Sequence, residues 1–98
     1  MKNPKQKIRV PIRVRINAKN ALVERQKFKD KPMTRSGIYT AKMLENGFIY
    51  KDRLGKVYSF LKRTAANTMT PRRKVAFNGW GGLAMIDFIE QYRRENNE

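Results

Sequence analysis

Residues 7–16 read Lys-Ile-Arg-Val-Pro-Ile-Arg-Val-Arg-Ile, and this stretch decides how the beginning of the chain folds. Its apolar residues occupy every second position from Ile8 to Ile16, the spacing typical of a strand with one buried face. Pro11 lies on the polar side and has no amide hydrogen to donate, which favours a strand at the edge of a sheet. We therefore predict an N-terminal edge strand over 8–16, whose outward face carries Arg9, Arg13 and Arg15.

Two helices are predicted after this strand. Asn17 is a good N-cap for a helix over about 18–29, because its side-chain oxygen accepts hydrogen bonds from the first helical amides. Thr34 or Ser36 caps a second helix, which ends at about Glu45 before a glycine that suits a helix stop. This second helix is the central helix of the predicted fold.

The second half of the chain predicts a hairpin, a loop, a turn and a last helix. The hairpin covers 48–61, with its turn at 52–55. A polar loop with two basic clusters follows over 62–74, and the Gly-rich sequence at 78–82 predicts a tight turn. A final amphipathic helix is predicted over 83–94. One apolar line of this helix consists of Leu83, Ile86 and Ile89.

The size and the apolar content predict one small domain. The chain has 98 residues, of which 40% are hydrophobic, and this is enough for a modest core. We predict a small single α+β domain over 8–94, with a flexible basic lead at 1–7 and a polar tail at 95–98. Its parts are an N-terminal edge strand, a central helix plus β-hairpin, a basic loop and a C-terminal amphipathic helix.

Charge and missing residue types limit the function. The 23 Lys and Arg against 8 Asp and Glu give a formal net charge of +15, which attracts polyanions and acidic surfaces. The chain has no Cys and no His, so thiolate nucleophiles, imidazole bases and the usual zinc ligands are excluded. We expect a protein that is not an enzyme, with no cofactor and no metal. No apolar run is long enough to span a bilayer, so we expect a cytoplasmic protein without a membrane partner.

The charge leads to two functional hypotheses. In the first, the cations contact the phosphates of DNA or RNA without sequence preference, as in a DNA-binding or ribosomal-type protein. In the second, the chain docks on a large partner protein. There the cations meet an acidic surface or occupy a nucleic-acid channel, and Trp80, Phe88 or Tyr92 act as buried anchors. Under either hypothesis the contact residues are Arg9, Arg13, Arg15, Lys62, Arg63, Arg72, Arg73 and Lys74.

Some features have a structural interpretation beside the functional one. The Arg row of the first strand either follows a phosphate backbone or is the charged face that keeps an edge strand from aggregating. A helix at 35–45 followed by a hairpin has the order of a recognition helix and its wing, an order that many unrelated α+β chains share. Four aromatic residues either stack on bases or form the core, and the core is favoured. They are Tyr39, Tyr50, Tyr58 and Phe60.

Thr70 and Pro71 lie in the predicted loop at 62–74. The peptide bond before a proline isomerises slowly, so an exposed loop proline is a candidate substrate for a prolyl isomerase. A proline that merely stiffens the loop is the more frequent case. The sequence leaves open both the partner and the isomer at this bond.

The length, the charge, the lack of Cys and His and the run from Lys7 to Arg15 together resemble a family of phage proteins, the anti-RecBCD accessory proteins of P22-like temperate phages. The resemblance implies a non-enzymatic protein that binds the RecC subunit of the host RecBCD helicase-nuclease. It implies that processing of DNA ends changes, so that phage recombination replaces degradation. It also implies a host cyclophilin as the partner of the Pro71 loop. Sequence-nonspecific nucleic-acid binding remains the alternative.

Overall fold

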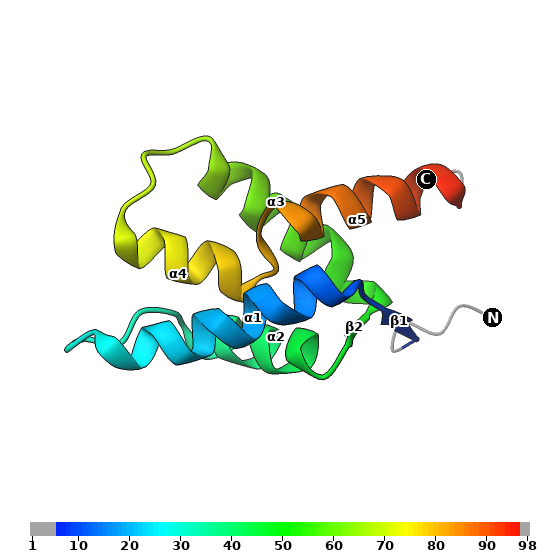
Figure 1. Cartoon of the computed structure of the whole chain (residues 1–98). Helices are drawn as coiled ribbons and strands as arrows, with labels where there is room; N and C mark the ends of the chain where they lie inside the picture. The colour runs from blue at the N-terminus through cyan, green and yellow to red at the C-terminus, as the bar shows by residue number, and fades with distance from the viewer. Residues whose placement is uncertain (1–5, 97–98) are drawn as a thin grey trace.

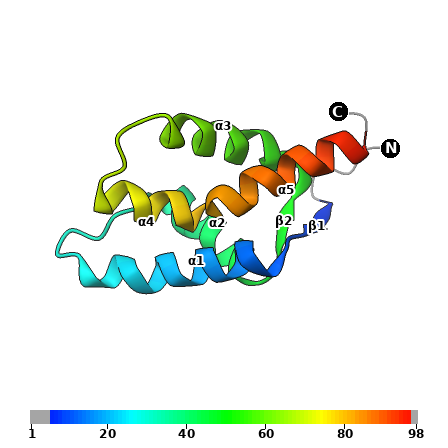
Figure 2. The same cartoon turned by 45° about the horizontal axis from the view of Figure 1, so that its top comes forward.

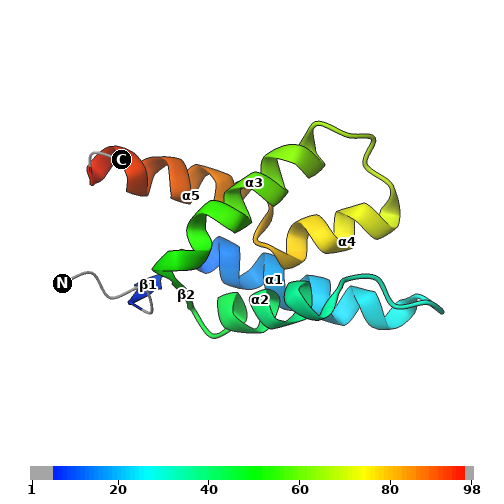
Figure 3. The ribbon, with the colours of Figure 1, turned by 180° about the vertical axis from the view of Figure 1, so that it is seen from behind.

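The computed structural model describes residues 6–96, which form helices and one two-stranded sheet. The helices α1 and α2 run side by side, and α3, α4 and α5 lie over them (Figures 1 and 3). Figure 2 shows α4 and α5 between α3 and α1. This arrangement is a small single α+β domain, which confirms the predicted fold class. In chain order, with η for short 3-10 helices, the elements are β1 (Lys7–Arg9), α1 (Ile12–Glu24), η1 (Arg25–Lys27), α2 (Arg35–Glu45), β2 (Phe48–Tyr50), η2 (Lys51–Arg53), α3 (Leu54–Ala65), α4 (Pro71–Gly79) and α5 (Gly82–Glu95).

The predicted strand over 8–16 is wrong beyond Val10. The amide of Val10 still donates to the carbonyl of Gly47, which leads into β2, over 3.0 Å. The chain then turns into α1 at Pro11, whose carbonyl accepts a hydrogen bond from the Val14 amide over 3.1 Å. A proline disfavours a helical conformation in the residue before it, while its own fixed φ suits the start of a helix. The extended segment and the helix therefore meet at this proline.

The first helix begins earlier than predicted because two periodicities overlap in its sequence. Ile12 is 67% exposed and Ile16 is 48% exposed, so these members of the alternating apolar set do not share the buried face. Asn17 is consequently not an N-cap but an interior residue of α1, which replaces the helix predicted over 18–29. The buried stripe of α1 has helical spacing and consists of Val14, Ala18 and Ala21.

The predicted central helix is confirmed as α2. Of the two candidate caps, Thr34 is the one used, because its Oγ1 accepts a hydrogen bond from the Gly37 amide over 3.1 Å. The helix ends before Gly47, which has a φ of 95°, a left-handed conformation that glycine adopts without strain. Local capping and stop signals thus set both ends of this helix.

The predicted hairpin over 48–61 is wrong. Its first part, β2, pairs antiparallel with β1, and Ile8 lies opposite Ile49. Its second part is the helix α3, so no wing follows α2 and the winged-helix interpretation fails. The reason is that the buried residues of this segment are spaced for a helix face rather than for a strand. They are Leu54, Val57 and Leu61.

The predicted basic loop over 62–74 is shorter than expected. It is bounded by α3, which ends at Ala65, and by α4, whose first residue is Pro71. Thr70 caps α4 by accepting a hydrogen bond from the Arg73 amide over 3.2 Å, and proline suits the first helical position. Thr70 and Pro71 therefore start a helix instead of lying within a loop. No peptide bond among the described residues is cis, so the Thr70–Pro71 bond is trans.

The last helix is confirmed as α5, with one change to its buried face. Ile86 and Ile89 are buried as expected, whereas Leu83 is 66% exposed. The core lies between the helices and includes Ile8 and Ile49 of the sheet. Its fully buried large side chains include Leu44, Ile49, Leu61, Met85 and Ile89.

The predicted ends of the domain fall partly outside the described residues. Of the basic lead at 1–7, residues 1–5 lie outside them, and Lys7 belongs to β1. Of the polar tail at 95–98, residues 97 and 98 lie outside them, and Glu95 is the last residue of α5. Across residues 6–96, no helix has the length and apolarity that a bilayer crossing requires.

Candidate docking groove and basic surface

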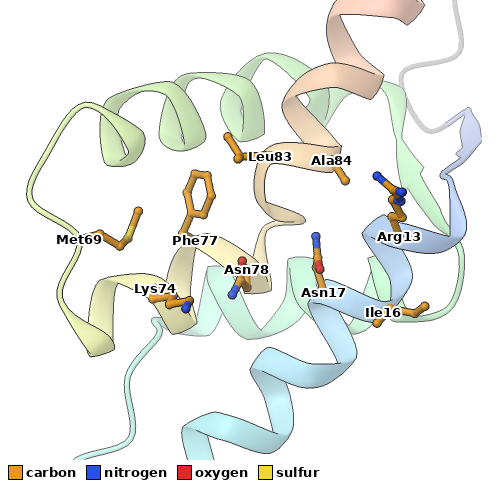
Figure 4. Close-up of a pocket in the computed structure, with 9 residues that line it drawn as sticks. All are labelled: Arg13, Ile16, Asn17, Met69, Lys74, Phe77, Asn78, Leu83 and Ala84. Carbon is orange, nitrogen blue, oxygen red and sulfur yellow. The ribbon is translucent and has the colours of Figure 1, made fainter.

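A cavity of about 480 Å³ opens between α1, the segment before α4, α4 itself and the start of α5. Figure 4 shows the side chains that reach it from these elements. Most of its exposed lining is apolar, so we call it the apolar groove. It is lined by Arg13, Ile16, Asn17, Met69, Lys74, Phe77, Asn78, Leu83 and Ala84.

Exposed apolar side chains surround this groove. Leu83 is 66% exposed, Ile16 is 48% exposed and Met69 is 41% exposed. A single exposed apolar residue is ordinary, but neighbouring ones around one depression are typical of a surface that another molecule covers. The groove thus gathers apolar surface that the chain's own core does not use.

The floor of the groove depends on the glycine-rich turn between α4 and α5. Asn17 Nδ2 donates a hydrogen bond to the carbonyl of Gly81 over 2.9 Å, which ties α1 to this turn. Gly81 has a φ of 105°, and a Cβ placed there would lie 2.4 Å from the Cβ of Met85. The turn therefore requires glycine, and it places Leu83, at the start of α5, in the lining of the same groove as Ile16 and Phe77.

Cations flank the apolar lining. Arg13 comes from α1 and Lys74 from α4, and both side chains are exposed. In Figure 4 they lie toward opposite sides of the groove, with Asn17 and Asn78 between them. No Asp or Glu is among the residues that line it. The groove is therefore apolar in its lining and positive at its rim.

The predicted Arg row is divided by the helix that replaces the strand. Arg13 reaches the apolar groove, whereas Arg9 and Arg15 line a separate cavity of about 540 Å³ near Gly47. Arg15 Nε also donates to the carbonyl of Glu45 over 3.4 Å. Because these side chains do not form one line, they do not present the continuous row that a strand would give to a phosphate backbone.

The other predicted cations lie on either side of the connection between α3 and α4. Lys62 and Arg63 are in the last turn of α3, where positive charge is favourable for the helix dipole. Three exposed cations occupy the first turn of α4, where the dipole disfavours them, and no acid accompanies them there. The Arg72 guanidinium contacts the Asp30 carbonyl and lies 5.8 Å from the Phe28 ring centre. Arg73 donates a hydrogen bond to the Thr68 carbonyl over 2.8 Å. The third cation is Lys74, which lines the groove.

The predicted apolar anchors lie away from the groove. Trp80 is 5% exposed and stacks on Phe60, with ring centres 4.4 Å apart, so it belongs to the core of this chain. Phe88 and Tyr92 are half-buried neighbours on α5, with ring centres 6.3 Å apart. The groove residues Ile16, Met69 and Leu83 were not predicted. The helical period that buries Val14, Ala18 and Ala21 would have placed Ile16 on the open side of α1.

The aromatic residues weighed as base-stacking platforms are mostly packed against the core. Tyr50, Tyr58 and Phe60 are half-buried there, whereas Tyr39 is 51% exposed and lies 5.2 Å below the Arg53 guanidinium. Tyr58 donates a hydrogen bond to Glu90 Oε2 over 2.7 Å. That bond, and then burial, raise the pKa of Tyr58 above its ordinary value of 10.0, with Arg93 acting in the opposite sense.

Within residues 6–96 the carboxylates compensate few of the cations. Lys27 and Glu24 form the ion pair found there, with 2.9 Å between Nζ and Oε1. Comparison of the chain with models of known protein families, with curated proteins and with solved structures finds no match.

Proposed function

We propose that this chain is a non-catalytic docking protein whose apolar groove binds an acidic, apolar-anchored segment of a partner protein. The observation that carries the proposal is the convergence of Ile16, Met69 and Leu83 on one groove with cations at its rim. Apolar side chains in such a groove supply most of the affinity, and charge complementarity at the rim selects the partner and speeds its approach.

The proposed partner is the RecC subunit of the host RecBCD helicase-nuclease, and the site of action is the host cytoplasm. Support for this choice is the resemblance to the anti-RecBCD proteins together with a positive groove rim that suits an acidic protein surface. Binding would change how the complex processes DNA ends, without any reaction on this chain.

A role without catalysis is supported by the residue types that the chain has. It contains neither His nor Cys, so the side chains that titrate nearest neutral pH are missing. The pKa of Tyr58 is raised above its ordinary value of 10.0, further from neutrality. Tyr58 therefore remains a protonated hydrogen-bond donor instead of serving as a base.

The proposal is tested by measuring the affinity of the purified chain for purified RecBCD, with the chain immobilised on a biosensor. The groove variant carries Ile16→Ser and Leu83→Ser, and we expect it to bind at least about tenfold more weakly. The matched control carries Ile12→Ser and Val23→Ser. These substitutions also remove two exposed aliphatic side chains, but outside the groove. The affinity of this control should stay within about twofold of the wild type. Equal losses in both variants would contradict docking through the groove.

Nucleic-acid binding without sequence preference is the second candidate function. It is favoured by the cations that flank the α3–α4 connection, because those in the first turn of α4 are not explained by helix stability. This function predicts an affinity for single-stranded DNA that falls steeply with salt, whereas docking in an apolar groove with cations only at its rim should weaken less steeply. Salt titrations of the two complexes therefore separate the candidates.

The proposed cyclophilin contact involves Thr70 and Pro71 at the start of α4. The carbonyl of Thr70 accepts a hydrogen bond from the Lys74 amide over 2.8 Å, in addition to the capping bond to its side chain. An isomerase that grips this proline must first open that turn. The substitution Thr70→Ala should lower the stability of this helix by about 1 kcal/mol, because it removes the cap. A cyclophilin should therefore bind the variant more tightly than the wild type. A titration that shows no change in cyclophilin affinity would contradict this contact.

A further inference from the structure

A further cavity, of about 560 Å³, lies on the other side of α4 from the apolar groove, between the first turn of α2 and α3. Its lining includes four cations and no Asp or Glu. We call it the cationic pocket, and the residues that define it are Lys31, Lys56, Arg63, Arg72, Phe60 and Trp80. So many positive charges around one cavity repel one another, and an anionic ligand would relieve that repulsion.

The first turn of α2 adds donors to this pocket. Lys56 Nζ donates to Ser36 Oγ over 3.3 Å, which holds its ammonium group near the N-terminus of the helix. Amides and the helix dipole at such an end favour a negative charge. The cations and the helix end thus act on the same space.

The indole N–H of Trp80 also belongs to this pocket. Trp80 is 5% exposed and lines the pocket, and its Nε1 would be 3.0 Å from a Cβ built on Gly37 in the first turn of α2. Among the hydrogen bonds of the described residues, none is donated by Trp80 Nε1. Arg53 donates through its Nη2 to Ser36 Oγ of the pocket over 3.3 Å, and its Nε is buried without a partner among the described residues. Buried donors are nearly always satisfied, so the unpaired Arg53 Nε favours an acceptor near Ser36, and the Trp80 N–H adds a donor inside the pocket.

The pocket also has an apolar wall. Phe60 stacks on Trp80, with 26° between the ring planes, and Met33 lies beside them. Its volume is within the range of small-molecule sites and larger than a simple oxyanion needs. We infer that the cationic pocket binds a nucleotide, with the phosphate on the cations and the base against the Phe60–Trp80 wall.

This inference is independent of the proposed docking function. Along α4 and its C-cap residue Trp80, Arg72, Ala76 and Trp80 line the cationic pocket, whereas Lys74 and Phe77 line the apolar groove. Residues four apart on a helix share a face, and residues two apart do not. The two cavities therefore lie on different sides of one helix, and the residues that line one can be substituted without changing the lining of the other.

The test uses the full chain and the fluorescence of Trp80, which is its one tryptophan. The probes are thymidine monophosphate, thymidine and inorganic phosphate, each titrated at the same ionic strength. We expect the nucleotide to change the fluorescence saturably and to bind at least about tenfold more tightly than either fragment, because only it engages cations and aromatic wall together. If thymidine or inorganic phosphate binds as tightly as the nucleotide, the inference is wrong.

Two double variants separate the pocket from the overall charge. Lys56→Gln with Arg63→Gln removes two pocket cations and should weaken nucleotide binding by at least about tenfold. Lys42→Gln with Arg94→Gln removes two exposed cations that do not line the pocket, and binding should stay within about twofold. Equal weakening would show that net charge alone attracts the nucleotide. The pocket variant should bind RecBCD as the wild type does, so failure of this inference is distinct from failure of the docking proposal.

Discussion

Leu83 and Leu61 show how much the place of a residue decides its role. Leu61 is fully buried between the helices, whereas Leu83 is 66% exposed at the apolar groove. We predict that Leu61→Ala lowers the free energy of unfolding by about 2–5 kcal/mol, because it leaves a cavity in the core. Leu83→Ala should change it by less than about 0.5 kcal/mol.

Urea denaturation followed by circular dichroism measures both values. A loss for Leu83→Ala as large as that for Leu61→Ala would place Leu83 in the core and remove it from the groove.

The hydrogen bond between Tyr58 and Glu90 gives the stability a pH dependence. Because it raises the pKa of Tyr58 in the folded chain, the folded state holds the phenol proton more tightly than the unfolded state. The stabilisation is complete below the unfolded pKa and is lost as pH rises through the folded one. We predict that Tyr58→Phe removes a phenol that ionises above the ordinary pKa of 10.0, as followed by phenolate absorbance. If the phenol that Tyr58→Phe removes has a pKa at or below the ordinary value of 10.0, the hydrogen bond to Glu90 is contradicted.

At the scale of elements, the turn between α4 and α5 depends on one glycine. Gly81→Ala places a Cβ 2.4 Å from the Met85 Cβ at a φ of 105°, so we predict a loss of more than about 1 kcal/mol in unfolding free energy. Gly55, near the start of α3, is the matched control, because a Cβ there meets nothing within 4 Å. Gly55→Ala should stabilise the chain by up to about 1 kcal/mol.

Thermal unfolding of the two variants measures the contrast. If Gly81→Ala unfolds at the same temperature as Gly55→Ala, the turn does not have the conformation described here.

Elements with local signals were predictable from the sequence, and those that depend on distant partners were not. The central helix has Thr34 as its cap and Gly47 as its stop, and both signals lie within its own sequence. The prediction for the first segment is wrong because Ile8 and Val10 follow a strand period, which was extended into α1. The helical period of α1 is hard to detect, because two of its buried residues are alanines with a weak hydrophobic signal. β2 pairs with a strand far away in sequence, which local alternation does not reveal.

At the scale of the whole molecule, the net charge of +15 acts against the compact state. At 0.1 M salt, the repulsion between exposed charges more than about 10 Å apart is largely screened. Raising the sodium chloride concentration should therefore weaken the repulsion among the cations. We predict that the Tm rises when sodium chloride increases from low to moderate concentration, as measured by calorimetry. A Tm that falls over this range would mean that favourable ion pairs dominate the stability of this chain.

Each candidate site is built from several elements of the folded chain. The sequence therefore predicted that cations would contact a partner, but not which cations share one cavity. Arg13, Lys74, Arg63 and Arg72 were all expected to contact an acidic partner, yet the fold assigns the first pair to the groove and the second to the cationic pocket. That division depends on the packing of α4 between α1 and α3, a tertiary arrangement that no local pattern encodes.

Hydrogen exchange of the chain, free and bound to RecBCD, tests the docking groove most directly. Amides in the segment before α4, around Met69, exchange readily when exposed and should become protected in the complex, as should those at the start of α5 near Leu83. Amides around Tyr39, on the exposed side of α2, should exchange at the same rate in both states. Protection around Tyr39 without protection around Met69 and Leu83 would contradict docking through the groove.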